Sequence, residues 1–364
     1  MNNTEKRFDI DASLAIKGIA ILMMLFHHLF RNGLYVHEKY DITYVPFPEV
    51  NVCNIATVCK ICVAIFTFIS GYGLYLNYKK RGNETGWVLS RGIKLLSSFW
   101  FIAILCWIIC QIIDGRVQSV YFSKSCYEGI VYMLVELLGC SWLLGTPLFV
   151  TEWWYMSAAI VFIFLIPIIF QFEDKLLLLL LMVIAFPRVL GVGYQGGCGI
   201  YTFLFGFMLG VFCARNDYVN KWINLYKGKR KLAKFITEFV FLILGYKLYR
   251  KIPIDIFWEF HFGLYPLLVI LFLTEFIIGI RSIKKILIFF GKHSTNIYLL
   301  HSVYLYIYLS EFIYNMPYFL LSYLVLTGIS LGSSIFIEWL KKVIKYEKLI
   351  LYMDNGLVKK CRNI

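Results

Sequence analysis

The sequence predicts an all-α polytopic membrane protein with about ten transmembrane helices and both termini in the cytoplasm. The 364 residues are 60% hydrophobic, with a mean hydropathy of +0.71, which is too apolar for a soluble domain. The apolar runs are long enough to cross a bilayer and lack the period-two alternation of a membrane β-barrel, so their backbone groups must be satisfied within helices. Most of the 36 Lys and Arg residues fall in alternate connecting segments. The positive-inside rule therefore explains the net charge of +14, and nucleic acid is not an expected partner.

The apolar runs define the expected spans in chain order. They lie at about 13–30, 59–78, 95–113, 154–171, 175–192, 199–213, 235–250, 257–279, 292–310 and 318–340. No small-residue cleavage site follows the first run, so it is expected to be a retained span. Residues 1–340 are expected to form a single transmembrane bundle, followed by a basic tail at 341–364. The segment from Glu338 onward mixes Lys with Ile, Leu and Tyr, which favours an interfacial amphipathic helix.

Two segments expected on the outer side are long, 31–58 and 114–153. The second is expected to hold an interfacial or re-entrant helix near 128–144. Long connections in membrane or soluble proteins are usually functional or disordered, and these two suit a lid or an acceptor groove. Cys59 and Cys62 could pair, as could cysteines expected on the outer side (Cys53, Cys126, Cys140 and Cys198), but free thiols are the expected state.

The first expected span carries ionisable groups at both ends. Lys17 and His28 lie eleven positions apart, which brings a helix back to within about 20° of the same face, some 16 Å further along its axis. His27 points roughly 80° away from that line. Ionisable residues in a span are costly and mark a functional site by default, although a lone membrane histidine can also be a packing residue.

Two further polar clusters lie on the expected cytoplasmic half. Ser70 lies towards the cytoplasmic end of the second span, beside Gly71 and Gly73, small residues that also allow close helix packing. Arg91 and Lys94 stand three residues apart at the start of the third span. They share a helix face and could clamp a phosphate or diphosphate, although a basic loop is also an ordinary topology signal.

The remaining candidates lie in the later spans. Trp154 and Tyr155 open the fourth span at the outer interface, where an aromatic belt is also expected. Ser294 is expected to N-cap the ninth span, which places His301 two turns into the membrane. Glu259 and His261 form a further polar pair without an assigned role.

Together these motifs resemble the acyltransferase-3 family of integral membrane acyltransferases. The matching segments are Lys17 to His28, Phe66 to Ser70-Gly71, Arg91 to Lys94, Trp154-Tyr155-Met156, and Tyr298-Leu-Leu-His301. The family has arginine where Lys17 and Lys94 stand here. Lysine keeps the charge but loses the bidentate geometry of arginine.

The resemblance implies an O-acyltransferase that takes an acyl group, usually acetyl, from cytoplasmic acetyl-CoA to a sugar hydroxyl on the outer side of the cell membrane. His28 would be the catalytic base or a transient acyl carrier. The donor-binding residues would be Lys17, Arg91, Lys94, Ser70 and His301, and the acceptor-binding residues Trp154, Tyr155 and His27.

The expected partners are acyl-CoA, a carbohydrate acceptor and membrane lipids. No bound metal or cofactor is expected. The acceptor, the acyl group and the oligomeric state, including a homo-oligomer, stay open. The alternative function is a secondary transporter, which predicts inverted repeats and paired helix breaks that the sequence does not show.

Overall fold

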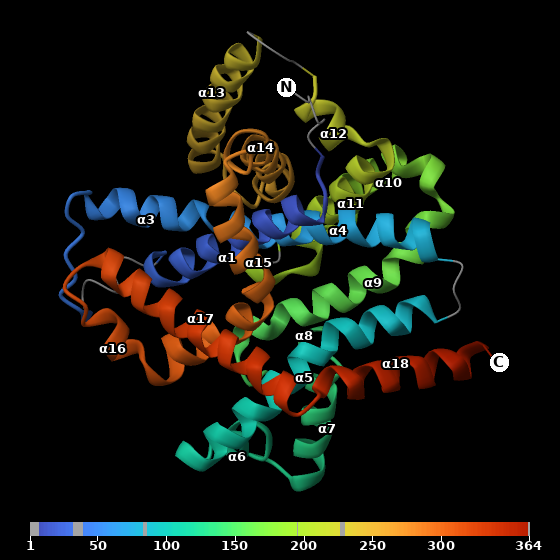
Figure 1. Ribbon diagram of the computed structural model, residues 1–364, viewed down its shortest axis with the longest axis vertical. Helices are drawn as coiled ribbons and strands as arrows, with labels where there is room; N and C mark the ends of the chain where they lie inside the picture. Colours follow the sequence, from blue (N-terminus) through green and yellow to red (C-terminus); the bar gives the residue numbers. More distant parts are fainter. Residues whose placement is uncertain (1–6, 32–38, 83–85, 195, 226–229, 363–364) are drawn as a thin grey trace. The chain divides into compact units, whose positions relative to one another are not determined.

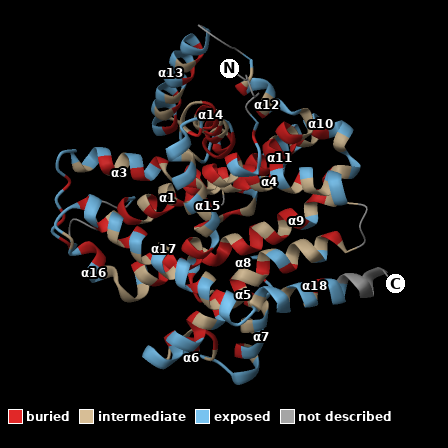
Figure 2. Ribbon diagram, viewed as in Figure 1, coloured by how far each residue is buried: buried red, intermediate tan, exposed pale blue. Residues whose placement is uncertain are grey.

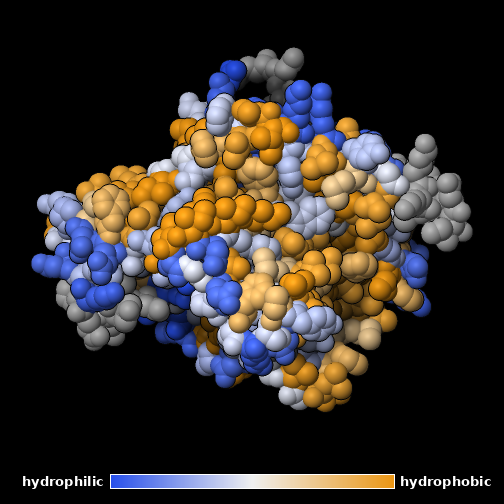
Figure 3. All heavy atoms as spheres, turned by 90° about the horizontal axis from the view of Figure 1, so that it is seen from below, coloured by the Kyte–Doolittle hydropathy of each residue, from blue (hydrophilic) through white to orange (hydrophobic). Residues whose placement is uncertain are grey.

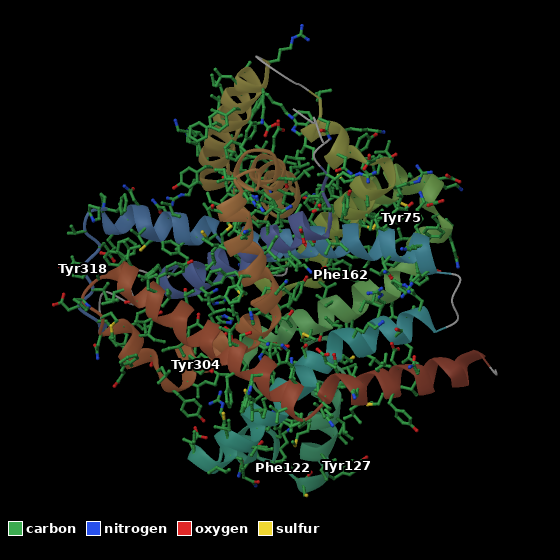
Figure 4. The ribbon with its side chains drawn as sticks, viewed as in Figure 1. Tyr75, Phe122, Tyr127, Phe162, Tyr304 and Tyr318 are labelled. Atoms are coloured by element: carbon green, nitrogen blue, oxygen red, sulfur yellow. The ribbon has the colours of Figure 1, made fainter. Side chains whose placement is uncertain are left out.

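The computed structural model describes residues 7–31, 39–82, 86–194, 196–225 and 230–362, and these residues are almost entirely helical (Figure 1). Their extended pairing is limited to one isolated parallel bridge between Thr43 and Tyr318, the latter labelled in Figure 4. The all-α prediction is therefore confirmed for the described chain.

Six helical segments of the described chain are long and apolar enough to cross a membrane. They are Ile10–Phe30, Glu49–Arg81, Trp87–Asp114, Thr151–Gln171, Phe260–Ile277 and Phe319–Val343. Each overlaps one of the expected spans. The other four expected spans correspond to two short apolar helices, α10 (Leu176–Val189) and α11 (Ile200–Asn216), and to two longer helices rich in basic residues, α13 (Arg230–Lys251) and α15 (Arg281–Ser302). The structure thus supports a multi-pass helical protein without confirming the count of ten.

The chain divides into two compact units. The first comprises residues 1–76, 169–294 and 311–328, and the second comprises 77–168, 295–310 and 329–364. The remaining elements, in chain order, are α1 (Ile10–Phe30), α3 (Glu49–Val58), α4 (Ile61–Arg81), α5 (Trp87–Asp114), α6 (Arg116–Tyr121), α7 (Cys126–Leu137), α8 (Ser141–Leu144), η1 (Thr151–Trp154), α9 (Tyr155–Gln171), η2 (Glu173–Lys175), η3 (Gly196–Cys198), α12 (Tyr218–Ile223), η4 (Phe260–Leu264), α14 (Tyr265–Phe272), η5 (Leu273–Ile277), η6 (Val303–Tyr308), α16 (Ser310–Tyr314), α17 (Phe319–Val343) and α18 (Tyr346–Arg362). The helices α4, α9, α15, α16 and α17 contribute residues to both units.

Glycines set the helix packing of the first unit. Gly18 on α1 lies against the backbone carbonyl of Leu287, and Gly291 on α15 lies against that of Leu14. A Cβ at either glycine would overlap backbone atoms, so this approach of α1 and α15 requires glycine at both positions. Buried residues accordingly line α1, α4 and α11 (red in Figure 2).

The expectation that Ser294 begins a helix is wrong. Helix α15 starts at Arg281, and the Ser294 hydroxyl donates within the helix to the carbonyl of Gly291 at 2.8 Å. Serine satisfies its hydroxyl in this way inside helices as well as at caps, so its presence alone did not fix the boundary.

The second unit has an aromatic and aliphatic core built on α5. Phe99 and Trp153 are almost fully buried and pack edge to face with ring centroids 5.1 Å apart. The opposite face of the second half of α5 exposes large apolar side chains: Ile104, Ile108, Ile109, Ile112 and Ile113. Figure 3 shows such apolar residues (orange) over much of the surface in view. A lipid environment accounts for this exposure, because a soluble protein rarely exposes so much contiguous apolar surface.

Helix α7 confirms the helix expected in the second long segment, although it ends earlier, at Leu137. Its Glu136 is 1% exposed and accepts a hydrogen bond from the Phe149 amide at 3.0 Å. Burial raises the pKa of this carboxyl to about 8, while the Phe149 amide opposes the shift. The folded protein therefore holds a proton at Glu136 that an unfolded chain releases near pH 4.5.

The stability of the protein should consequently fall as the pH rises from about 5 to 8, because the unfolded state binds fewer protons over this range. We expect Glu136→Gln, which keeps an acceptor for Phe149, to flatten this part of the profile and to raise the melting temperature at pH 8. Thermal unfolding of the detergent-solubilised protein measures it. The exposed acid Glu311, replaced by Gln, is the control. Identical profiles for wild type and Glu136→Gln would contradict the assignment.

Candidate functional site

Helix α1 carries Lys17, His27 and His28 on one uninterrupted element. Asp9 caps its N-terminus by accepting from the Ala12 amide at 2.7 Å, and the helix ends at Phe30. Lys17 and His28 are both half-buried. The predicted eleven-residue spacing is therefore realised within a single regular helix, which places the two groups on one face about 16 Å apart along the axis.

His27 is buried and fixed between α1 and α3. Its Nδ1 lies 2.7 Å from the carbonyl oxygen of Ala56. A carbonyl only accepts, so Nδ1 carries the proton and donates. The His28 ring packs edge to face on that of His27 at 5.3 Å, and the charges of Arg31 and Lys60 act on the His27 ring. The more exposed His28 is thus held against the ring of a hydrogen-bonded neighbour.

The Ser70-Gly71 segment lies on α4. Gly71 touches the backbone carbonyl of Phe207 on α11, and Gly210 of α11 touches that of Phe68. Gly73 has open space around it, and Ser70 is half-buried. Close helix packing therefore explains Gly71, and it leaves Ser70 without a packing role of this kind.

The basic pair of the second unit lies at the start of α5. The Arg91 guanidinium stacks over the Trp87 ring at 5.8 Å. Lys94 is half-exposed, and its Nζ lies 3.5 Å from Oδ2 of Asp354 on α18. The helix places the two cations on neighbouring positions, as their spacing predicted, and each is steadied by a partner from the unit itself.

The aromatic and histidine candidates of the second unit lie within a fixed network. The Tyr298 hydroxyl donates to the carbonyl of Glu152 at 2.5 Å, and Tyr298 packs edge to face on Tyr155 at 6.1 Å. His301 is fully buried. Its Nδ1 donates to the Tyr298 carbonyl at 2.7 Å, and its Nε2 lies 3.0 Å from the Ser302 hydroxyl.

Both nitrogens of His301 are therefore engaged by the protein, which suits a residue that orients Tyr298 better than one that reaches a ligand directly. Trp154 is buried as well, with its ring near those of Trp142 and Tyr155. Tyr155 is the more exposed of the two aromatic candidates.

The predicted residues thus fall into two sets. The first unit holds Lys17, His27, His28 and Ser70, and the second holds Arg91, Lys94, Trp154, Tyr155 and His301.

Buried charged residues that were not predicted as site residues occur in the first unit. Lys234, Glu238 and Glu275 are all buried, and the Lys234 Nζ lies 2.5 Å from Glu275 Oε2 and 3.6 Å from Glu238 Oε1. Their signal in the sequence is an isolated acid, Glu275, inside the apolar run of residues 270–280. Glu259, noted without a role, pairs with Arg188 through two hydrogen bonds of 2.6 and 2.8 Å.

Segments with i→i+5 hydrogen bonds mark these buried groups. The π-helical turn η4 contains His261, and η5 contains Glu275. A third, η6, begins two residues after His301. Such turns are rare in proteins, and those that occur often lie at functional sites. No residue pattern in the sequence predicts them.

The helical fold, the exposed apolar faces and the ionisable groups within the spans define a multi-pass membrane protein with a candidate catalytic site. Comparison with protein families assigns its class: a model of the acyltransferase domain of the acyltransferase-3 type matches residues 10–339. The chain belongs to this family, and the predicted family resemblance is confirmed. No curated protein and no solved structure matches the chain.

Proposed function

We propose that the protein is an O-acyltransferase of the cell membrane that moves an acyl group, acetyl in the first instance, from cytoplasmic acyl-CoA to a hydroxyl of a sugar or cell-surface glycan on the outer face. The match of nearly the whole chain to the acyltransferase family carries this proposal. The distribution of Lys and Arg supports cytoplasmic termini.

His28 is the proposed general base. Its imidazole removes the proton of the acceptor hydroxyl as the oxygen attacks the thioester carbonyl carbon. The C–S bond then breaks, and the leaving CoA sulfur takes the proton back from the imidazolium. The alternative route forms an acyl-imidazole: the His28 nitrogen attacks the thioester carbonyl carbon and the C–S bond breaks to release CoA, and then the acceptor hydroxyl attacks the acyl-imidazole and the N–acyl bond breaks, which frees His28. The packing of His28 on the fixed His27 ring supports either role, because a base must be held within reach of the proton that it takes.

The donor is proposed to bind through basic and hydroxyl groups. Arg91 and Lys94 meet its phosphates, and Lys17 adds a charge on α1. Ser70 supplies a hydroxyl. His301 contributes indirectly, through the Tyr298 carbonyl that its Nδ1 contacts.

The acceptor is proposed to meet Tyr155 and Trp154, whose aromatic faces suit the apolar face of a pyranose ring. His27 on α1 is the third proposed acceptor-binding residue. Of these, Tyr155 is the more exposed and should contribute most of the contact with the sugar.

Binding and hydrolysis of acetyl-CoA by the purified protein test this proposal. We expect saturable binding and slow donor turnover without an acceptor. A well-folded preparation that binds no acyl-CoA would contradict the proposal and favour the transporter alternative.

Lys17→Ala should raise the KM for the donor about tenfold or more, because a charge-assisted contact is lost. Lys17→Arg should retain most activity, since the positive charge stays and a guanidinium group binds phosphate at least as well as an ammonium group. Steady-state kinetics with varied acetyl-CoA measure both. An inactive Lys17→Arg beside an active Lys17→Ala would show that Lys17 has another role.

A further inference from the structure

The C-terminal helix α18 lies along the first half of α5, within the second unit (Figure 1). Near its start, the Tyr346 hydroxyl donates to the Ser97 carbonyl at 2.8 Å, and the Tyr346 and Phe101 rings pack edge to face at 5.0 Å. Two turns later, Asp354 meets Ser90 and Lys94. The two helices therefore run antiparallel, and α18 covers the part of α5 that carries Lys94.

Asp354 makes its contacts with one oxygen only. Its Oδ2 accepts from the Ser90 hydroxyl at 3.0 Å and lies 3.5 Å from the Lys94 Nζ. The residue is only 7% exposed, and its Oδ1 is buried without a hydrogen-bond partner among the described residues. A buried carboxylate that is half satisfied is a poor structural anchor, because the unpaired oxygen has lost its water without replacement.

We infer that Asp354 is an internal substitute for the donor's phosphate, so that α18 must move off Lys94 before acyl-CoA binds there. This inference rests on the proposed function, which assigns donor phosphates to Arg91 and Lys94. An anion already occupies the position in which Lys94 would meet a phosphate oxygen. A phosphate offers more charge and three acceptor oxygens, whereas Asp354 meets Lys94 through one oxygen at 3.5 Å, and an ion pair with a half-exposed lysine contributes little. The donor therefore displaces Asp354. When no donor is present, the Asp354 carboxylate disfavours the binding of weaker anionic ligands to Lys94.

Titration of CoA into the purified full-length protein tests the inference. Asp354→Asn should bind CoA about two- to fivefold more tightly, because only a weak ion pair has to be replaced. In acyl transfer the KM for the donor should fall by the same factor with kcat unchanged. Ser90→Ala, which loosens Asp354 without changing charge, should shift the affinity in the same direction. Glu347→Gln removes an exposed carboxylate from the same helix and is the matched control.

The combination with Lys94→Gln shows whether the effect passes through Lys94. Lys94→Gln alone should weaken CoA binding, and adding Asp354→Asn to it should then change nothing further. Unchanged or weaker CoA binding by Asp354→Asn, while wild type binds CoA and Lys94→Gln binds it less well, would overturn this inference and leave the proposed function standing. Absence of CoA binding by every variant, Asp354→Asn included, would overturn both. Size-exclusion profiles establish that each variant is folded.

Discussion

Replacing His28 by alanine should abolish acyl transfer while the protein still folds and inserts. A positioned general base contributes about 10²- to 10⁴-fold in rate, so kcat should fall by at least that lower factor. If His28 is instead the acyl carrier, the loss should be complete. Half-buried at the end of α1, His28 is not part of the tightly packed core, so its removal should leave the fold intact.

Transfer of a radiolabelled acetyl group by purified wild type and variant measures this effect, with the size-exclusion profile as the check on folding. His28→Gln is the matched control for shape, because it keeps a polar side chain of similar size but cannot accept the proton at neutral pH. Near-normal turnover by His28→Ala would remove this residue from the catalytic role.

Gly18→Ala and Gly291→Ala should each destabilise the protein by about 1–3 kcal/mol, which is the usual effect of overpacking a close-packed core. Each added methyl group would meet a backbone carbonyl of the opposing helix, of Leu287 and of Leu14 respectively, and backbone cannot turn aside as a side chain can. Since α1 carries Lys17 and His28, a shift of α1 against α15 should also lower activity.

Thermal unfolding in detergent measures the loss of stability. Gly73→Ala is the internal control, because this helical glycine of α4 has no atoms within 4 Å of an added Cβ. It should keep or slightly raise the melting temperature, since alanine is the better helix former. Equal melting temperatures for Gly18→Ala and wild type would contradict the packing account.

The helical class could be predicted because it depends on composition and on the length of the apolar segments. Neither depends on how the helices pack against one another. The first helix could be predicted closely: its apolar run is uninterrupted, it ends at Phe30 as expected, and Lys17 and His28 lie on it. It begins at Ile10, before the expected residue 13, because Asp9 caps it. The family was also predictable, since its motifs occur in order along the chain, and the match to residues 10–339 confirms it.

Contacts between distant segments could not be predicted. The Ala56 carbonyl that fixes His27 offers no sequence signal, because every residue has such a group. The C-terminal segment was expected to be amphipathic, but its pairing of Asp354 with Ser90 joins residues 264 positions apart. The π-helical turns at His261 and Glu275 were missed for a similar reason, since tertiary packing and not local propensity decides them.

Proteoliposomes that contain the purified protein provide the most direct test of the central claim. Acetyl-CoA labelled in the acetyl group is supplied on the side proposed to be cytoplasmic, and an acceptor glycan is enclosed on the other side. A membrane acyltransferase should move the label onto the glycan and release free CoA, and His28→Ala should do neither. Uptake of an intact labelled substrate without any acyl transfer would contradict the account and identify a transporter.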